Sequence, residues 1–117
     1  MPVQITTVLY PVKDLEATKA LFTTVFGAGP HVDSPYYVGF SVDGHEIGLV
    51  PGGHGQGMTG PVAFYDVEDI EDTLAALRGA GARVVQEPTD VAAGLLVAKV
   101  QDADGNEIGL RQVPAGS

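Results

Sequence analysis

The 117-residue sequence contains no cysteine and no tryptophan, and only six of its residues are lysine or arginine. The lack of cysteine excludes disulfides, thiolate metal sites and thiol nucleophiles, so a hydrophobic core must stabilise the fold. Fifteen acidic residues leave a net charge of −9, which disfavours nucleic acid as a partner because phosphate backbones require basic patches. No apolar run approaches the ~20 residues of a membrane helix, so no membrane partner is expected.

The length and composition favour one small globular domain, since 44% of the residues are hydrophobic. The N-terminal residues lack a basic segment followed by a long apolar stretch, which is the pattern of a secretory signal. We therefore expect a cytoplasmic protein.

Two segments of the chain are repeated. Residues 43–49 (DGHEIGL) recur as 104–110 (DGNEIGL), and residues 12–18 (VKDLEAT) resemble 67–73 (VEDIEDT). The repeats divide the chain into a first module (3–50), a glycine-rich connector (51–60) that we expect to be mobile, and a second module (61–113). The second copy is longer, and its extra residues are expected in loops around 87–94.

Each module has the pattern of a strand, a helix and three further strands. Asp14 and Asp69 stand at helix N-cap positions, and glycines at 27, 29, 79 and 81 are expected to end the two helices as left-handed C-caps. Helical spacing gives one apolar stripe of Leu15, Leu21, Phe22, Val25 and Phe26, and another of Ile70, Leu74 and Leu77. Short apolar runs bounded by turn residues predict strands at 5–12, 31–33, 36–42, 46–50, 62–67, 83–86, 95–100 and 107–112.

In this order, the VKDLE and VEDIE helix openings and the closing DADGNEIGL at 102–110 resemble the vicinal oxygen chelate superfamily. That superfamily groups glyoxalases, bleomycin-resistance proteins, epimerases and extradiol dioxygenases. The resemblance implies an α+β fold in which tandem β-α-β-β-β modules form an open, eight-stranded, barrel-like sheet around a cleft, with the helices outside. It also implies a homodimer.

The resemblance further implies where metal-binding members place their ligands. Those positions fall on the first strand of each module, at Thr7 and Val62, and on the last strand, at Gly48 and Gly109. Glycine and valine side chains donate nothing to a metal ion, so neither a metal site nor another cofactor is expected. The histidines at 31, 45 and 54 are interpreted as solvated polar residues.

Strand alternation predicts which residues face the cleft. Paired glycines would let a flat aromatic group approach the backbone, above an apolar floor with a polar rim. Because Phe64, Gly48 and Gly109 fit a purely structural role equally well, that alternative stays open. The candidate ligand-binding residues are Thr7, Leu9, Tyr37, Gly39, Glu46, Gly48, Val50, Val62, Phe64, Lys99, Glu107, Gly109 and Arg111.

The leading hypothesis is a small-molecule binding protein, similar to the metal-free bleomycin-resistance branch, that sequesters an aromatic or cationic compound. Its negative charge would attract a cation. No catalytic residue is assigned. The alternative is a glyoxalase or other lyase, an epimerase or a dioxygenase-type enzyme, with Glu46, Glu107 or Tyr37 available for acid and base chemistry. A third reading is an accessory subunit with a vestigial cleft.

Overall fold

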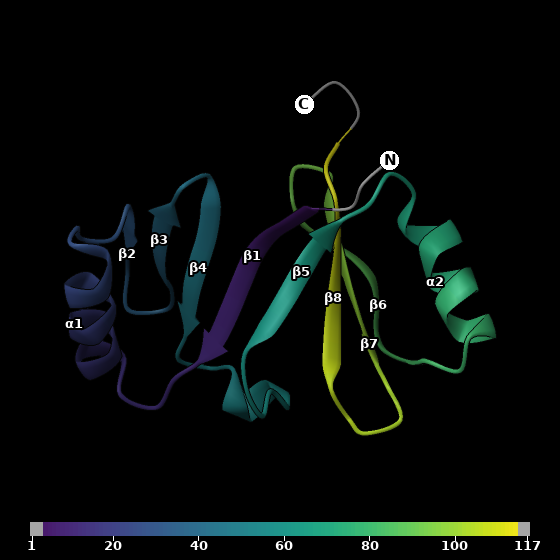
Figure 1. The fold of residues 1–117 in the computed structure, drawn as a ribbon, viewed down its shortest axis with the longest axis horizontal. Coiled ribbons are helices and arrows are strands. Elements are labelled where there is room, and N and C mark those ends of the chain that lie inside the picture. The colour runs from purple at the N-terminus through teal and green to yellow at the C-terminus, as the bar shows by residue number, and fades with distance from the viewer. Residues whose placement is uncertain (1–3, 115–117) are drawn as a thin grey trace. The chain divides into compact units, whose positions relative to one another are not determined.

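The computed structural model describes residues 4–114 and confirms the order β-α-β-β-β in both modules (Figure 1). No helix in this part of the chain is long and apolar enough to span a bilayer. The first module has β1 (Gln4–Pro11), α1 (Leu15–Phe26), β2 (Val32–Asp33), β3 (Val38–Val42) and β4 (His45–Val50). A short 3₁₀ helix, η1 (His54–Gln56), follows, and the second module has β5 (Val62–Asp66), α2 (Ile70–Gly79), β6 (Arg83–Ala92), β7 (Leu95–Gln101) and β8 (Glu107–Gln112).

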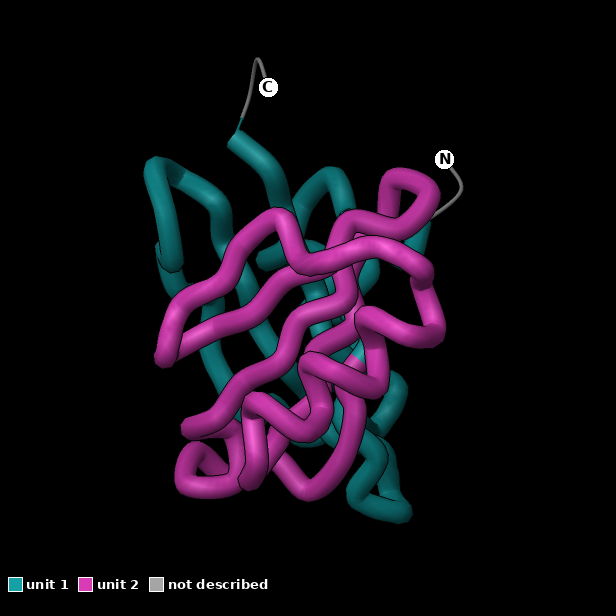
Figure 2. The backbone as a smooth tube through the Cα atoms, turned by 90° about the vertical axis from the view of Figure 1, so that its left-hand side faces the viewer, with its two compact units in different colours: residues 1–5, 63–117 teal, residues 6–62 magenta. Residues whose placement is uncertain are grey.

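The chain forms two compact units (Figure 2). Unit 2, residues 6–62, holds most of the first module, and unit 1, residues 1–5 and 63–117, holds most of the second. The strands run in the order β2-β3-β4-β1 in the first module and β5-β8-β7-β6 in the second. The sheets are mixed, because β1 is parallel to β4 and β5 is parallel to β8 whereas the other pairs within each module are antiparallel. The predicted α+β fold is confirmed, and the shared cleft stays a prediction.

The helix ends form largely as predicted. Asp14 accepts a hydrogen bond from the Ala17 N–H at 3.1 Å, and Asp69 accepts one from the Asp72 N–H at 3.0 Å, so both are N-caps. Gly27 ends α1 in the left-handed region, with φ +71°, whereas Gly29 does not adopt that conformation, so its predicted capping role is wrong. For α2, the left-handed residue is Gly81 at φ +102°, whereas Gly79 is the last helical residue, so the predicted capping role of Gly79 is wrong.

Each helix contacts the sheet of its own module, α1 at β3 and β4 and α2 at β6, β7 and β8. In Figure 1, α1 lies next to β2 and α2 lies next to β6 and β7. In unit 2, Phe22 and Phe26 contact a buried cluster that includes Val38, Phe40 and Leu49. In unit 1, Ile70 and Leu74 are buried against Ala98, Val100 and Leu110. The predicted stripe on α1 was too wide: Leu21 and Val25 remain 67% and 72% exposed, because each lies about 100° around the helix from the neighbouring phenylalanine.

The hairpin turns fix the strand register. Asp43 and Gly44 have φ values of +55° and +83°, as a two-residue type I′ turn requires, and they set Gly39 opposite Gly48. In the second module Gly105 is left-handed at φ +85°, and Val100 faces Ile108. The predicted registers of β3 with β4 and of β7 with β8 are confirmed. They determine which side chains face away from the helices.

Two regions differ from the sequence prediction. The segment 87–92 was expected as a loop but continues β6 as a strand. Its pairing with β7 has register shifts, and within the module β6 pairs only with β7. Such irregular strands with one free edge accommodate a proline, here Pro88. The connector contains the helix η1, and Gly53 lies close enough to Pro11 and Met58 that an added Cβ would be 2.8 Å from Pro11 Cβ. The buried Met58 side chain gives this segment local packing.

Candidate functional site

The predicted site residues gather on the face of each sheet that is not covered by its helix, here called the helix-free face. On this face Leu9 and Gly39 flank Gly48 in unit 2, and Phe64 and Lys99 flank Gly109 in unit 1. The remaining candidates follow the same register: Thr7 beside Glu46, Val50 beside Pro11, Glu107 beside Gln101, and Arg111 beside Asp66, while buried Val62 begins β5. Tyr37 immediately precedes β3.

In unit 2 the space above the paired glycines is filled by Tyr37. A Cβ built on Gly48 would touch the Tyr37 hydroxyl and lie 2.7 Å from Tyr37 Cε1, and one built on Gly39 would lie 2.9 Å from Tyr37 Cε2. Side-chain atoms do not approach so closely, so only glycine lets the ring lie there. The place where the sequence predicted a flat aromatic group of a ligand is therefore occupied by the ring of Tyr37.

Unit 1 uses the same arrangement with a different residue. A Cβ built on Gly109 would lie 2.6 Å from Phe64 Cγ and 2.7 Å from Phe64 Cε2. The Phe64 side chain is 4% exposed, so its ring is packed rather than offered to solvent. Gly48 and Gly109, at positions where the resemblance implies metal ligands in other members, are thus each covered by an aromatic ring.

Glu46 joins Tyr37 and His31 in a hydrogen-bonded network within unit 2. The Tyr37 hydroxyl donates to Glu46 Oε2 at 2.5 Å, and His31 Nε2 lies 2.6 Å from Glu46 Oε1. Burial, followed by the hydrogen bond to Glu46, raises the pKa of Tyr37 well above its ordinary value, so the phenol stays protonated. The sequence interpretation of His31 missed this contact, which depends on the pairing of β2 with β3.

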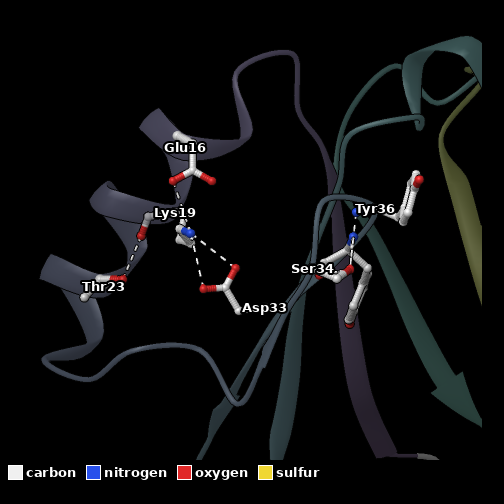
Figure 3. A network of polar contacts seen from close by, with 7 residues as sticks. Glu16, Lys19, Thr23, Asp33, Ser34 and Tyr36 are labelled. Carbon is white, nitrogen blue, oxygen red and sulfur yellow. Dashed lines mark hydrogen bonds and ion pairs between the residues drawn. The ribbon is translucent and has the colours of Figure 1, made fainter.

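A serine turn positions Tyr37 for this contact, and Figure 3 shows Ser34 at this turn next to Tyr36. Ser34 Oγ accepts hydrogen bonds from the backbone N–H groups of Tyr36 and Tyr37, and donates to the Tyr37 carbonyl at 3.0 Å. Beside it, Lys19 on α1 binds both Glu16 and Asp33 at 3.2 Å, which ties the helix to β2. The turn and this ion pair hold the segment that carries His31 and Tyr37.

The raised pKa of Tyr37 predicts a loss of stability in alkaline solution. Because the folded pKa exceeds the unfolded value of about 10, the stabilisation is complete below pH ~10 and is lost as the pH rises toward the folded pKa. Urea unfolding at pH 8 and pH 11 should show a larger loss for the wild-type protein than for Tyr37→Phe. An equal loss in both proteins would contradict a half-buried phenol that is hydrogen-bonded to Glu46.

The helix-free face of unit 1 carries two ion pairs. Lys99 Nζ lies 3.8 Å from Glu107 Oε1, and Arg111 lies 3.3 Å from Asp66. The Lys99 and Glu107 side chains are only 15% and 13% exposed. Glu107 Oε1 is buried and has no hydrogen-bond partner among the described residues. Asp66 lies within the predicted strand 62–67, and the register of β5 with β8 places it opposite Arg111.

The residues present do not fit the divalent metal that the resemblance implies for metal-binding members. Of the four positions concerned, Thr7 has a single hydroxyl and Gly48, Val62 and Gly109 have no donor side chain. Within residues 4–114, no three histidine, aspartate or glutamate side chains form a group that could hold a metal ion. A bound metal needs about three or more such donors converging on one point.

Comparisons with known proteins agree with this architecture. The family model described as "Glyoxalase/Bleomycin resistance protein/Dioxygenase superfamily" matches residues 4–110. A search of curated proteins found no significant match.

Several solved structures share the fold. A glyoxalase/bleomycin resistance protein/dioxygenase superfamily member from Vibrio splendidus 12B01 gives a TM-score of 0.70 at 18% identity, covering 95% of this chain and 98% of that chain. Methylmalonyl-CoA epimerase from Streptomyces coelicolor gives 0.72 at 16% identity, covering 96% and 95%. A Mn(II)-bound glyoxalase from Novosphingobium aromaticivorans gives 0.70 at 21% identity, covering 93% of this chain and 38% of that chain. At these identities the likeness concerns the fold alone.

Proposed function

This chain belongs to the glyoxalase/bleomycin resistance protein/dioxygenase superfamily, and from that premise we propose that it binds a small aromatic or cationic molecule without a metal ion. The carrying observation is that both helix-free faces present a carboxylate at the same repeat position, Glu46 and Glu107, next to a glycine covered by an aromatic ring. Partly buried carboxylates attract cationic and hydrogen-bond-donating groups. Cation attraction is expected at Glu46, whose ion-pair partner among the described residues is His31, whereas Lys99 already balances the charge of Glu107. The net charge of −9 also favours a positively charged ligand.

A thermal-shift titration tests the proposal, with benzyltrimethylammonium as the cationic aromatic probe and toluenesulfonate as its charge-reversed control. At 100 times its dissociation constant, a bound ligand stabilises the folded state by about 2.7 kcal/mol, which calorimetry detects readily. We expect stabilisation by the cation only. In the same assay Mn²⁺, Ni²⁺ and Zn²⁺ should cause no specific stabilisation, and elemental analysis of protein purified without chelator should find no stoichiometric metal. Stoichiometric metal would refute the metal-free part of the proposal.

The alternative is an enzyme of the same superfamily, and the Tyr37–Glu46–His31 network favours it. A carboxylate bonded to both a phenol and an imidazole can accept or deliver a proton when a substrate replaces one partner. Methylmalonyl-CoA is a reasonable first substrate, because an epimerase for it shares the fold. Deuterium incorporation from D₂O into this thioester, abolished by Glu46→Gln, would favour the enzyme over the binding protein.

The proposal also includes the pairing of two copies, which the resemblance implies. Light scattering should then give a molar mass twice the 12.1 kDa of the chain.

A further inference from the structure

The side of α1 that points away from the buried cluster of unit 2, here called the outer face of α1, carries no charged residue. Helical spacing places five exposed residues on it: Ala17, Ala20, Leu21, Thr24 and Val25. Leu21 and Val25, at 67% and 72% exposure, are the two most exposed leucine, isoleucine or valine side chains of residues 4–114. The outer side of a surface helix is ordinarily polar, so a helix that is apolar on both sides indicates that a second surface covers it.

The repeat provides an internal comparison for these two exposed side chains. When the repeated helix openings are aligned, Leu21 corresponds to Ala76 of α2. Val25 corresponds to Ala80, the residue that follows α2. Both alanines are exposed as well. The fold therefore does not require a large apolar residue at either position, and packing within the chain does not explain Leu21 and Val25.

Charge favours a second copy of this chain as the surface that covers α1. A net charge of −9 makes two copies repel each other, so they associate best through a surface that brings no acid against another acid. A twofold axis places such a surface against itself. The charged residues within α1, Glu16 and Lys19, lie beside the outer face and pair with each other, and Lys19 also binds Asp33 (Figure 3). The outer face of α1 meets the condition for self-association.

The sizes of the side chains fit two α1 helices that pack antiparallel. With the twofold axis at Leu21, this residue lies against Leu21 of the other copy, and positions four residues before and after it come opposite each other. Val25 then meets Ala17, so a large side chain faces a small one. Antiparallel helices also place the opposite ends of their dipoles side by side, which is favourable. The outer face of α1 is therefore complementary to itself in shape as well as in charge.

We infer that two copies of the chain associate through the outer faces of their α1 helices, antiparallel and with Leu21 at the twofold axis. This inference rests on the pairing included in the proposed function and adds the surface that makes it. The contact joins two helices of 12 residues each, which is small for a protein interface. We therefore expect a weak dimer that salt strengthens, because salt screens the repulsion between two acidic chains. The contact leaves the helix-free face of unit 2 uncovered.

The test is sedimentation equilibrium of the full chain at micromolar to millimolar concentrations, in low and in high salt. The molar mass of the wild-type protein should rise with concentration toward twice the 12.1 kDa of the chain. Leu21→Glu should weaken the association by at least about 100-fold, because the twofold axis brings the two new carboxylates together in an apolar contact. Since Leu21 is exposed in the single chain, circular dichroism should show an unchanged fold.

Three further samples show whether the effect belongs to this surface. Ala76→Glu is the matched control, because it adds the same charge at the equivalent exposed position of α2, and it should leave the association nearly unchanged. Leu21→Lys should prevent pairing although it makes the chain less acidic. A mixture of the Leu21→Glu and Leu21→Lys proteins should form dimers again, because opposite charges then meet at the axis.

The outcomes separate the inference from the proposed function. Dimers that Leu21→Glu disrupts and the mixture restores support the inference. If wild-type dimers form and Leu21→Glu does not weaken them, the pairing stands and the inference is wrong. Equal weakening by Ala76→Glu, or a mixture that stays monomeric, also overturns it. If the wild-type protein is monomeric at every concentration, both the pairing and the inference are refuted, whereas the titration with benzyltrimethylammonium still decides cation binding.

Phosphatidylcholine vesicles test the other occupant of an apolar helix face, a lipid surface. We expect no cosedimentation of the wild-type protein with them, because helices that lie on membranes carry several basic residues and α1 has a single lysine. A monomeric wild-type protein that cosediments with the vesicles, and loses this binding in Leu21→Glu, would assign the outer face of α1 to lipid and overturn the inference.

Discussion

The Gly109→Ala substitution is expected to lower the free energy of unfolding by about 3 kcal/mol, at the upper end of the cost of overpacking a core. The new Cβ would lie 2.6 Å from Phe64 Cγ, which is close to the root of a buried ring rather than at a flexible end. The ring must move away from the sheet, and its 4% exposure leaves it little room. Urea unfolding followed by circular dichroism measures the loss, and the melting temperature should fall by roughly 10 °C or more.

Gly79→Ala is the matched control. Gly79 is the last residue of α2 and has no atom within 4 Å of a built Cβ, so alanine should stabilise the protein by up to about 1 kcal/mol. Combining Gly109→Ala with Phe64→Leu should cost less than the two single changes together, because both act on one contact. Additive losses, or equal effects of the two alanine substitutions, would show that Phe64 does not restrain position 109.

The Phe40→Ala substitution is expected to cost about 3–5 kcal/mol, as for other large-to-small changes in a core. Phe40 is 1% exposed, and its ring centroid lies 5.3 Å from that of Phe26 and 6.1 Å from that of Phe22, both on α1. Its loss leaves a cavity where α1 packs on the sheet and removes two aromatic contacts. Since small domains have only about 5–15 kcal/mol of stability, the variant should unfold at much lower urea concentration.

Tyr36→Ala is the control for loss of an aromatic side chain in the same unit. Tyr36 is 83% exposed, and its backbone rather than its ring is bonded to Ser34, so its removal should change stability by no more than about 0.5 kcal/mol. If Phe40→Ala cost less than 1 kcal/mol, α1 would not depend on this aromatic cluster.

Local patterns predicted the elements well where one residue decides a backbone conformation. Asp14 and Asp69 cap helices, Asp43 and Gly44 form the type I′ turn, and Gly105 adopts the left-handed region. Each depends on hydrogen bonds or steric limits within a few residues, which a sequence displays directly. The prediction failed at 87–92, where pairing with β7 keeps the chain extended despite Pro88. Strand pairing involves residues distant in sequence and overrides local turn signals.

The sequence predicted which face of the sheet each candidate site residue lies on, but not which side chains contact one another there. Alternation placed Glu46 and Glu107 on the helix-free faces, since the strand period is fixed by backbone geometry. It did not reveal that Tyr37 and Phe64 cover the glycines, or that His31 bonds Glu46. Side-chain rotamers and the pairing of β2 with β3 decide those contacts, and neither is encoded in the spacing of residues.

The sequence by itself determined the tandem β-α-β-β-β plan, the helix N-caps, the hairpin registers and the lack of donor side chains at Val62, Gly48 and Gly109, because each depends on residue identity and short spacing. Only the tertiary structure decided that both oxygens of Glu46 are hydrogen-bonded, whereas Glu107 Oε1 has an ion pair with Lys99 but no hydrogen-bond partner among residues 4–114. That difference arises because the pairing of β2, β3 and β4 brings His31 and Tyr37 next to Glu46. Strand pairing is decided by packing in three dimensions.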